Sequence, residues 1–320
     1  MQRREFLYIL SALTLSPFAL NACRSTNLPL RIGIHPWPGY EPLFLAENFG
    51  WLPENFVLDP GDNAGDSLSG LLNGTLDGAC LTLDEVLMAR SLGVPLVVVL
   101  VMNESVGADM VLTRPDIQHF GDLAGKRIAV EESAVGGLVL AKLLAAAQLE
   151  RHDVEILNIP PDRHYHAWQQ GHIDAAVTYE PIATHLRRLG GERLFDSRRF
   201  PGFIFDVLAL RTDRLRRHTA SIKNLITAHF RALDHLRLNR EDAMRRIAYW
   251  RQLTYVEAET SFAGLSLPST AANRRMLAPG GALEEAADSL STIMYANDLL
   301  TDPVSLDGLT TSAYLPRSKI

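Results

Sequence analysis

Short apolar runs and amphipathic segments alternate along residues 30–210, and this alternation constrains the fold more than any other feature of the sequence. The run Leu30–His35 alternates as a strand does, and the Val-rich run Leu96–Met102 is unbroken, as expected for a strand buried on both faces. Between them, Pro42–Phe49 has helical character and stops at Gly50. The pattern predicts an α/β fold with mostly parallel sheets and flanking helices.

The expected strands and helices follow one another without internal repeats, and the chain from residue 212 onward is mostly helical. We expect strands over 30–35, 56–59, 79–83, 96–102, 109–113, 126–130, 154–159, 175–179 and 203–210. We expect helices over 42–49, 66–73, 84–92, 134–147, 163–170, 182–189, 221–238 and 241–249.

Composition narrows the class of protein. The chain has 320 residues, 47% hydrophobic and 21% charged, which is enough apolar material for a core and enough length for two lobes. Its formal net charge of −6 argues against nucleic acid as a partner, because nucleic-acid binding calls for a basic surface. Its two cysteines, Cys23 and Cys80, exclude a disulfide framework as the device that holds the fold together.

The first residues form an export signal. Arg3 and Arg4 precede an uncharged apolar stretch over residues 6–20, which is too short for a comfortable membrane span and is typical of a signal peptide. The sequence Leu20-Asn-Ala-Cys23 resembles a bacterial lipobox. This resemblance implies that residues 1–22 are removed, that Cys23 is acylated and that residues 23–29 form a tether. The twin arginines also resemble a Tat signal, so both the Sec and the Tat routes stay open, as does an anchor that is never cleaved.

Three stretches carry a family resemblance. They are Trp37-Pro-Gly-Tyr-Glu-Pro-Leu-Phe-Leu-Ala46, Asp122-Leu-Ala-Gly-Lys-Arg-Ile-Ala-Val130 and Gly171-His-Ile-Asp-Ala-Ala-Val177. In this order they resemble the substrate-binding proteins of nitrate/sulfonate/taurine-type ABC importers along most of the mature chain.

The resemblance implies the type II periplasmic-binding-protein architecture, with a ligand cleft between two lobes. We place residues 30–112 and 206–320 in the first lobe and residues 113–205 in the second. The implied protein is a monomer that binds a small molecule, closes about a hinge and docks on an ABC permease and ATPase complex. A lipid anchor would hold it on the outer side of the cytoplasmic membrane, in the periplasm or at the cell surface.

Most candidate ligand-binding residues follow from the rule that ligands of open α/β sheets lie beyond the carboxyl ends of the strands. Asp206 lies instead on the strand that returns to the first lobe, where it could face the ligand or fix the hinge. Trp37 could instead fill the core, Asp84 could cap a helix, and the glutamates could lie in solvent. The set is acidic and aromatic, which favours a nitrogen-bearing or heteroaromatic ligand over sulfonate or nitrate. The set comprises Trp37, Tyr40, Asp84, Glu131, Glu132, Ser133, Tyr179, Glu180 and Asp206.

Other classes of protein are weaker hypotheses. Four histidines suggest a metal site, but the i, i+2 spacing of His164 and His166 points their rings apart on a helix, so we expect no metal and no cofactor. The sequence contains no Gly-x-Ser-x-Gly motif, and we expect no catalysis. The implied family also includes a pyrimidine synthase with a cysteine-rich iron-binding run, which this sequence lacks. A ligand-sensing lipoprotein that regulates a membrane partner stays open. The histidines concerned are His164, His166, His172 and His185.

Overall fold

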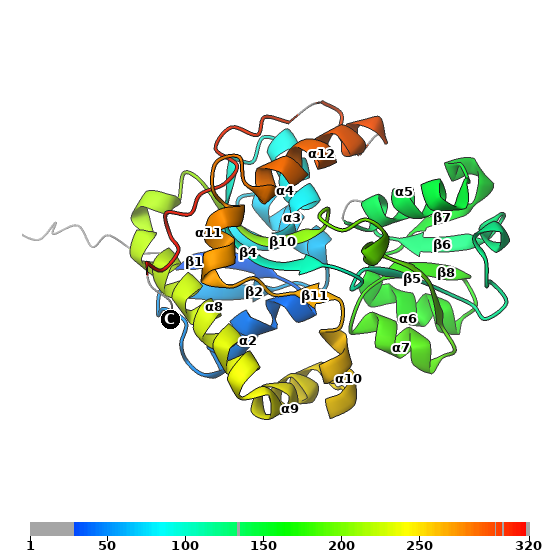
Figure 1. The fold of residues 1–320 in the computed structure, drawn as a ribbon, viewed down its shortest axis with the longest axis horizontal. Coiled ribbons are helices and arrows are strands. Elements are labelled where there is room, and N and C mark those ends of the chain that lie inside the picture. The colour runs from blue at the N-terminus through cyan, green and yellow to red at the C-terminus, as the bar shows by residue number, and fades with distance from the viewer. Residues whose placement is uncertain (1–28, 133–134, 298, 303, 318–320) are drawn as a thin grey trace, which may run out of the picture.

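The computed structural model describes residues 29–132, 135–297, 299–302 and 304–317. Two sheets, each with helices packed on it, lie side by side (Figure 1), and we call these bodies the first and second lobes. The predicted signal peptide and the predicted sites Cys23 and Ser133 lie outside the described residues. Within the described ranges, no helix has both the length and the apolar character that a membrane span requires.

The first lobe is built on a six-stranded sheet in the order β11-β4-β10-β3-β1-β2. Its strands are β1 (Leu30–Ile34), β2 (Phe56–Pro60), β3 (Gly78–Thr82), β4 (Leu96–Ser105), β10 (Phe205–Arg211) and β11 (Leu265–Ser266). Its helices are α2 (Glu41–Asn48), α3 (Ala64–Leu72), α4 (Leu83–Ser91), α8 (Thr219–Leu238), α9 (Arg240–Arg251), α10 (Tyr255–Ser261), α11 (Thr270–Met276) and α12 (Ala282–Ala296).

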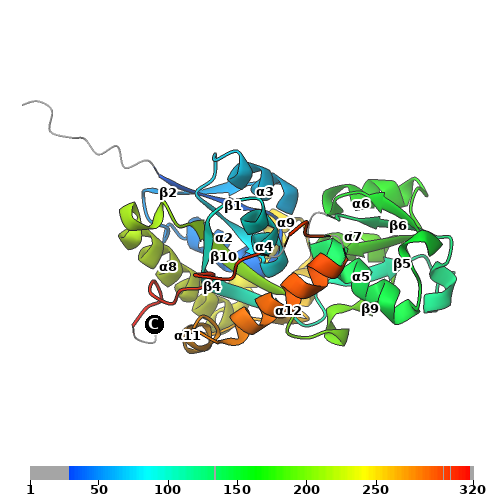
Figure 2. The same ribbon diagram turned by 90° about the horizontal axis from the view of Figure 1, so that it is seen from above.

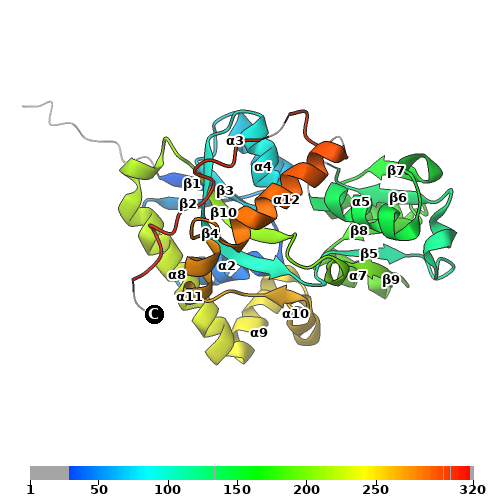
Figure 3. The ribbon, with the colours of Figure 1, turned by 45° about the horizontal axis from the view of Figure 1, so that its top comes forward.

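The second lobe is built on a five-stranded sheet in the order β7-β6-β8-β5-β9. Its strands are β5 (Met110–Thr113), β6 (Arg127–Val130), β7 (Glu155–Asn158), β8 (Ala175–Thr178) and β9 (Glu192–Asp196). Its helices are α5 (Val135–Ala147), α6 (Pro161–Gln169) and α7 (Ile182–Arg188). The C-terminal end of α12 reaches this lobe and lies beside α5 (Figures 2 and 3), where Asn297 and Leu299 line a small pocket together with Gly137.

The α/β class is confirmed, but the sheets are mixed rather than mostly parallel. β1 pairs in parallel with β2 and β3, whereas β10 runs antiparallel to both β3 and β4. In the second sheet β5 runs antiparallel to β8 and β9. The reason is that β10 and β5 are each reached by a crossing from the other lobe and enter their sheet from the opposite end.

One lobe boundary and one strand differ from the sequence prediction. Residues 110–112, expected in the first lobe, belong to β5 and pair with strands of the second sheet. The chain therefore crosses between the lobes at residues 106–109, and it returns at residues 197–204 between β9 and β10. Strand β9 was not expected because its sequence, Glu-Arg-Leu-Phe-Asp, is half charged and lies at a sheet edge, where few apolar residues are needed.

The two crossings lie side by side and are bonded to each other. The hydroxyl oxygens of Ser105 and Ser197 are 2.8 Å apart, and the Gly107 backbone N–H donates to Ser197 Oγ over 2.6 Å. The backbone N–H of Ser197 donates to the carbonyl of Asp109 over 2.9 Å. Gly107 has φ of +110°, a conformation that side chains with a Cβ rarely adopt. The paired crossings form the only covalent links between the two sheets among the described residues.

The outer edge of β4 is covered by side chains and irregular backbone. β11 pairs with Ser105 and Glu104, and the backbone of Val98 bonds with Leu309 and Thr311. Between them, the buried side chain of Asn273 accepts from the Val101 N–H over 2.7 Å and donates to the Val101 carbonyl over 3.0 Å. The Asn273 amide thus takes the place of a neighbouring strand. It supplies hydrogen-bond partners to buried backbone groups at the edge of the sheet.

We predict that Asn273→Ala lowers the free energy of unfolding by about 2 kcal/mol, because it leaves a buried N–H and C=O of Val101 without partners. Urea denaturation followed by circular dichroism measures this change. Asn224→Ala, on the exposed side of α8, is the matched control and should change stability by less than about 0.5 kcal/mol. Equal stability of the two variants would contradict this account of the β4 edge.

Candidate functional site

Loops that follow parallel strands meet where the two lobes face each other. Trp37 and Tyr40 follow β1, and Asp84 lies in the first turn of α4, directly after β3. From the second lobe, Glu131 follows β6 and Tyr179 follows β8. The rings of Trp37 and Tyr179 contact edge to face, with centroids 5.2 Å apart. We call the side chains gathered here the junction cluster: His35, Trp37, Tyr40, Asp84, Glu85, Asn103, Asp109, Glu131, Tyr179 and Asp206.

A buried hydrogen-bond chain fixes the first-lobe half of the cluster. Trp37 Nε1 donates to Asn103 Oδ1 over 3.0 Å, and Asn103 Nδ2 donates to Asp206 Oδ2 over 2.6 Å. Tyr40 Oη donates to Asp206 Oδ1 over 2.7 Å. Both carboxylate oxygens of Asp206 are therefore engaged, and two aromatic rings are held in place from the β1 loop.

The local sequence explains how Trp37 reaches this position. Trp37 precedes Pro38 and is extended, with φ of −152° and ψ of 133°, as a residue before proline prefers. Gly39 then allows the close approach, since a Cβ at this position would lie 1.6 Å from Asn103 Oδ1 and 2.5 Å from Trp37 Nε1. The Trp-Pro-Gly-Tyr turn thus delivers both rings to one place.

The cluster carries five buried carboxyl groups from four segments of the chain. Asp84 and Glu85 come from α4, Asp109 from the first crossing, Glu131 from the loop after β6, and Asp206 from β10. In the described part of the chain, none of the five forms an ion pair. Buried acids of other proteins are usually paired, so this concentration of unpaired acids is unusual.

Burial raises the pKa of these acids. Desolvation raises the pKa of Asp84 to about 6 and that of Asp109 to about 7, with the Asp84 charge as a further cause for Asp109. Desolvation likewise raises the pKa of Glu131 to about 7. The pKa values of Glu85 and Asp206 are raised well above their usual range, again chiefly by burial. The site therefore favours protons or another source of positive charge.

Several polar atoms at the cluster have no partner within the described residues. Asp84 Oδ1 and Asp109 Oδ2 accept no hydrogen bond, although their residues are only 2% and 3% exposed. His35 Nδ1 and Thr178 Oγ1 are also buried without partners. Thr178 ends β8 and pairs in register with Met110, directly after Asp109. Unsatisfied buried polar atoms in one place indicate a site that binds something.

The two lobes are closed on each other around the cluster. Glu131 Oε1 accepts from the Gly65 N–H over 3.2 Å, and Asn63 Nδ2 donates to Asp162 Oδ1 over 3.1 Å. On another side Arg188 of α7 pairs with Glu257 of α10, with Nε and Oε1 2.7 Å apart. A ligand would reach the cluster only after the lobes separate.

Two predicted site residues point elsewhere. Glu180 Oε2 accepts from the Thr184 N–H over 2.9 Å, and its Oε1 lies 2.9 Å from Arg187 Nη2, so Glu180 holds the start of α7. Glu132 pairs with Arg151 at the surface of the second lobe. Trp37, Tyr40, Asp84, Glu131, Tyr179 and Asp206 are brought together in the cluster.

Four members of the cluster were not predicted from the sequence. Asn103 lies inside the long buried strand β4, and Asp109 lies at the crossing that follows it. Polar residues after an unbroken apolar run were the available signal for both. Glu85 accepts from the Thr82 N–H over 2.8 Å in a capping box, so Thr82 rather than Asp84 caps α4. The fourth member, His35, directly follows β1.

The histidines remain separate from one another. His164 is buried, its Nε2 lies 2.8 Å from the Ile159 carbonyl, and burial lowers its pKa to about 4. His185 packs edge to face on Tyr165 with centroids 6.0 Å apart. Across the described ranges, no three His, Cys, Asp or Glu side chains converge as metal ligands would.

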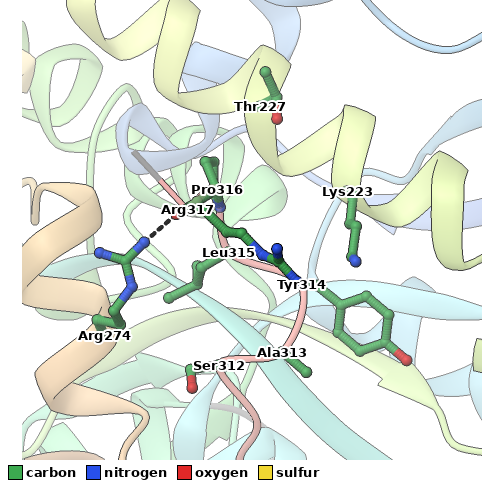
Figure 4. A pocket seen from close by; sticks show the side chains of 9 residues that line it. All are labelled: Lys223, Thr227, Arg274, Ser312, Ala313, Tyr314, Leu315, Pro316 and Arg317. Carbon is green, nitrogen blue, oxygen red and sulfur yellow. Dashed lines mark hydrogen bonds between the residues drawn. The ribbon is translucent and has the colours of Figure 1, made fainter. Parts of the chain in front are cut away.

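A second concave region lies on the first lobe, away from the junction. Figure 4 shows this pocket of about 500 Å³, in which Lys223 of α8, Arg274 of α11 and Arg317 surround the C-terminal segment. Arg274 bonds to the Pro316 carbonyl. The basic side chains are exposed, and Arg274 bonds to the C-terminal segment, so we assign the pocket a structural role.

Comparison with known proteins identifies the family. The profile of the NMT1-like family matches residues 25–251, which is more than half of the chain. The chain belongs to the NMT1-like family. It is 26% identical over 270 residues to a candidate binding protein of Brucella abortus, covering 81% of this chain and 82% of that one. It is 27% identical over 165 residues to the taurine-binding periplasmic protein of Escherichia coli, covering 51% of each.

Solved structures share the fold of this NMT1-like chain. The alkanesulfonate-binding protein SsuA from Xanthomonas axonopodis pv. citri, bound to MOPS, superposes with a TM-score of 0.74 at 19% identity, covering 86% of this chain and 95% of that one. The two-lobe fold of periplasmic binding proteins is thus confirmed, and the family supports a solute-binding role.

The same fold also occurs in an enzyme. The desulfurization enzyme DszB superposes with a TM-score of 0.65 at 16% identity, covering 89% of this chain and 97% of that one. Fold alone therefore does not separate binding from catalysis. The named relatives of the NMT1-like chain that match in sequence are binding proteins rather than enzymes.

We predict that Gly39→Ala breaks the Trp37–Asn103 hydrogen bond, because the new methyl group would overlap the Asn103 amide. The expected loss of stability is on the order of 3 kcal/mol, visible as a lower melting temperature and a changed tryptophan emission. Gly121→Ala is the control, since a Cβ there meets no atom within 4 Å. An unchanged emission spectrum in Gly39→Ala would show that Trp37 is not fixed by this network.

We predict that Asp109→Asn changes how stability depends on pH. The pKa of Asp109 is about 7 in the folded protein against an ordinary value of 3.8, so the folded state keeps a proton that the unfolded state has released. This contribution is fully present below about pH 4 and is lost as pH rises through 7. The free energy of unfolding of the variant, relative to that of the wild type, should therefore rise by on the order of 3 kcal/mol between pH 4 and pH 8.

Urea midpoints measured across that pH range for wild type and variant provide the test. Asp288→Asn, at an exposed position of α12, is the control, and its urea midpoint should depend on pH as that of the wild type does. A difference between Asp109→Asn and wild type that stays constant with pH would contradict the assignment.

Proposed function

We propose that this chain is the extracytoplasmic solute-binding component of an ABC importer that captures a small organic ligand between its lobes. The observation that carries the proposal is the junction cluster, where aromatic rings and unpaired carboxyl groups from both lobes converge beyond the strand ends. A nitrogen-bearing or heteroaromatic ligand suits these groups, because rings offer stacking faces and carboxylates accept hydrogen bonds.

The proposed mechanism is hinge opening and closure. Residues 106–109 and 197–204, which carry the chain between the sheets, are the proposed hinge. The ligand would bind first to Trp37, Tyr40 and Asp206, which the first lobe holds rigidly, and closure would add Glu131 and Tyr179. The observed free energy of binding is then the favourable free energy of these contacts minus the free-energy cost of closing the lobes.

A relative and the predicted leader support the proposed location of this importer component. The taurine-binding protein of Escherichia coli is named as periplasmic. We propose the same compartment for this chain, with acylated Cys23 anchoring a monomer to the membrane and residues 23–29 as its tether. The closed form would dock on a permease that an ATPase drives.

We propose that the chain binds without catalysis. Cys80, the one cysteine among the described residues, is fully buried, and burial raises the pKa of its thiol. A buried, protonated thiol is a poor nucleophile. The junction cluster itself holds acids and aromatic rings that suit recognition.

We predict that Trp37→Ala and Tyr179→Ala each weaken ligand binding by about tenfold or more, because each removes an aromatic face at the junction. The probe is whichever compound most raises the melting temperature in a panel of amines, heteroaromatic bases, sulfonates and nitrate. Calorimetry measures its affinity. Tyr249→Ala is the control, since that ring is 87% exposed on α9. This variant should bind the probe compound with the same affinity as the wild type.

Small-angle X-ray scattering of the same samples tests the mechanism. A ligand-free population with a larger radius of gyration than the ligand-bound protein supports opening and closure. Tight binding that survives both aromatic substitutions would place the ligand site elsewhere and defeat the proposal.

A further inference from the structure

We infer that the ligand presents a positively charged group, an ammonium or an amidinium, to Asp84, Asp109 and Asp206 at the junction of the lobes. This inference rests on the proposed function and names the chemical class of ligand for that same site. It differs from the anions that two similar proteins bind by name, sulfonate and nitrate. Taurine, named for a third relative, carries an ammonium group as well as a sulfonate.

Strand register and mutual charge effects place the three aspartates near one another. Asp206 pairs in register with Thr82, two residues before Asp84, and with Asn103 on its other side. Asp109 follows β4 at the crossing and feels the charge of Asp84, while Asp206 feels the charges of both. Three carboxyl groups from β10, α4 and the first crossing therefore share one small region.

Free lone pairs show where a ligand donor would sit. Both oxygens of Asp206 are taken by Tyr40 and Asn103, but Asp84 Oδ1 and Asp109 Oδ2 are buried without a hydrogen-bond partner in the described residues. Ammonium carries three N–H donors and amidinium four, so either group has enough donors for both oxygens. A cation there would also offset the mutual repulsion of the carboxylates.

In the described part of the chain, no lysine or arginine side chain forms an ion pair with these carboxyl groups. Arg251 is near enough to influence His35, but its Nε lies 2.6 Å from Glu41 Oε1 and its guanidinium stacks on Phe44. Arg187 is held by Glu180. Arg251 Nη2 has no hydrogen-bond partner among the described residues, but neither Arg251 nor Arg187 pairs with a carboxyl group of the junction cluster. Protons or a cationic ligand are the remaining sources of positive charge there.

Aromatic rings complete the environment that an organic cation prefers. Trp37, Tyr40 and Tyr179 border the carboxyl groups, and the His35 ring contacts Tyr40 with centroids 5.2 Å apart. Burial lowers the pKa of His35 to about 4, so this ring is neutral at physiological pH and does not repel a cation. Ring faces attract ammonium groups, and the attraction grows when water is excluded.

An anion would meet the opposite conditions. A sulfonate placed against Asp84 and Asp109 would add charge of the same sign in a region that is already desolvated. Its oxygens would also find acceptors where they need donors. The residues that border the site in this chain therefore select against the ligand type that the sulfonate-binding relative holds.

The test uses compounds that share a skeleton and differ in charge, with calorimetry on the purified full-length chain. The aromatic series is benzylamine, benzyl alcohol and phenylmethanesulfonate, and the aliphatic series is putrescine, butanediol and butanesulfonate. We expect the amine of at least one series to bind about tenfold or more tightly than its neutral and anionic partners. Binding of the amine should also be tighter at pH 8 than at pH 5, because Asp109 and Glu131, each with a pKa of about 7, release their protons.

Two variants locate the charge. Asp84→Asn and Asp109→Asn should each weaken amine binding by about tenfold while leaving the protein folded, since the amide removes an unpaired buried charge. Asp288→Asn, on the exposed face of α12, should bind as the wild type does. Unchanged amine affinity in both cluster variants would overturn the inference.

The outcomes separate this inference from the proposed function. Sulfonates or alcohols that bind more tightly than amines, and lose affinity in Trp37→Ala, would overturn the cation class and leave the solute-binding role standing. Failure of every amine to bind at about 10 mM would likewise overturn the cation class. Failure of all six compounds and of the wider metabolite panel would count against both.

Discussion

The pair of hydrogen-bonded side chains Asn103 and Asp206 holds the site together, because it ties β4 to β10. These are the first-lobe strands nearest to the two crossings, so a bond between them sets where the second lobe begins. A register shift lies directly beside the pair, between Asp206 and Val207, and a bulge of this kind re-aims side chains locally. From this bond the network extends to Trp37 and Tyr40, so the geometry of the backbone crossing and that of the aromatic walls are set together.

Closure of the lobes is balanced between weak contacts and an unfavourable charge distribution. The ion pair between Arg188 and Glu257 joins partly exposed side chains and contributes at most about 1 kcal/mol. Against this, the closed form holds buried carboxyl groups that have no cation beside them, and their burial raises the pKa of Asp109 and Glu131. A closed state that is only marginally favourable responds strongly to a ligand that supplies the missing charge. A permease could then distinguish loaded from empty protein by how fully the lobes are closed.

Sequence patterns predicted the class of fold and most of the residues that meet in the junction cluster, because both depend on local rules. Strand-helix alternation indicates an α/β fold, and residues after strand ends lie at one edge, which is why the sequence alone was enough to choose Trp37 and Asp84. What failed depended on tertiary contacts. Glu180 has the right position in the chain, but a free N–H at the start of α7 and Arg187 compete for it. Asp109 became part of the site because the crossing lies at residues 106–109, before the expected boundary between residues 112 and 113, and no local pattern marks such a crossing.

The fold leaves the sign of the ligand open, and the few residues at the junction decide it. Sulfonate-, nitrate- and taurine-binding proteins and a desulfurization enzyme resemble this chain in backbone or sequence, yet they act on different molecules. The hydrogen bonds from Asn103 and Tyr40 to Asp206 would persist whatever the lobes enclose. The free oxygens of Asp84 and Asp109 have no such internal purpose, and burying them lowers stability. Two buried carboxyl groups that destabilise the empty protein are best explained by a ligand that binds them. Because carboxylates are negatively charged, that ligand would carry a positive charge.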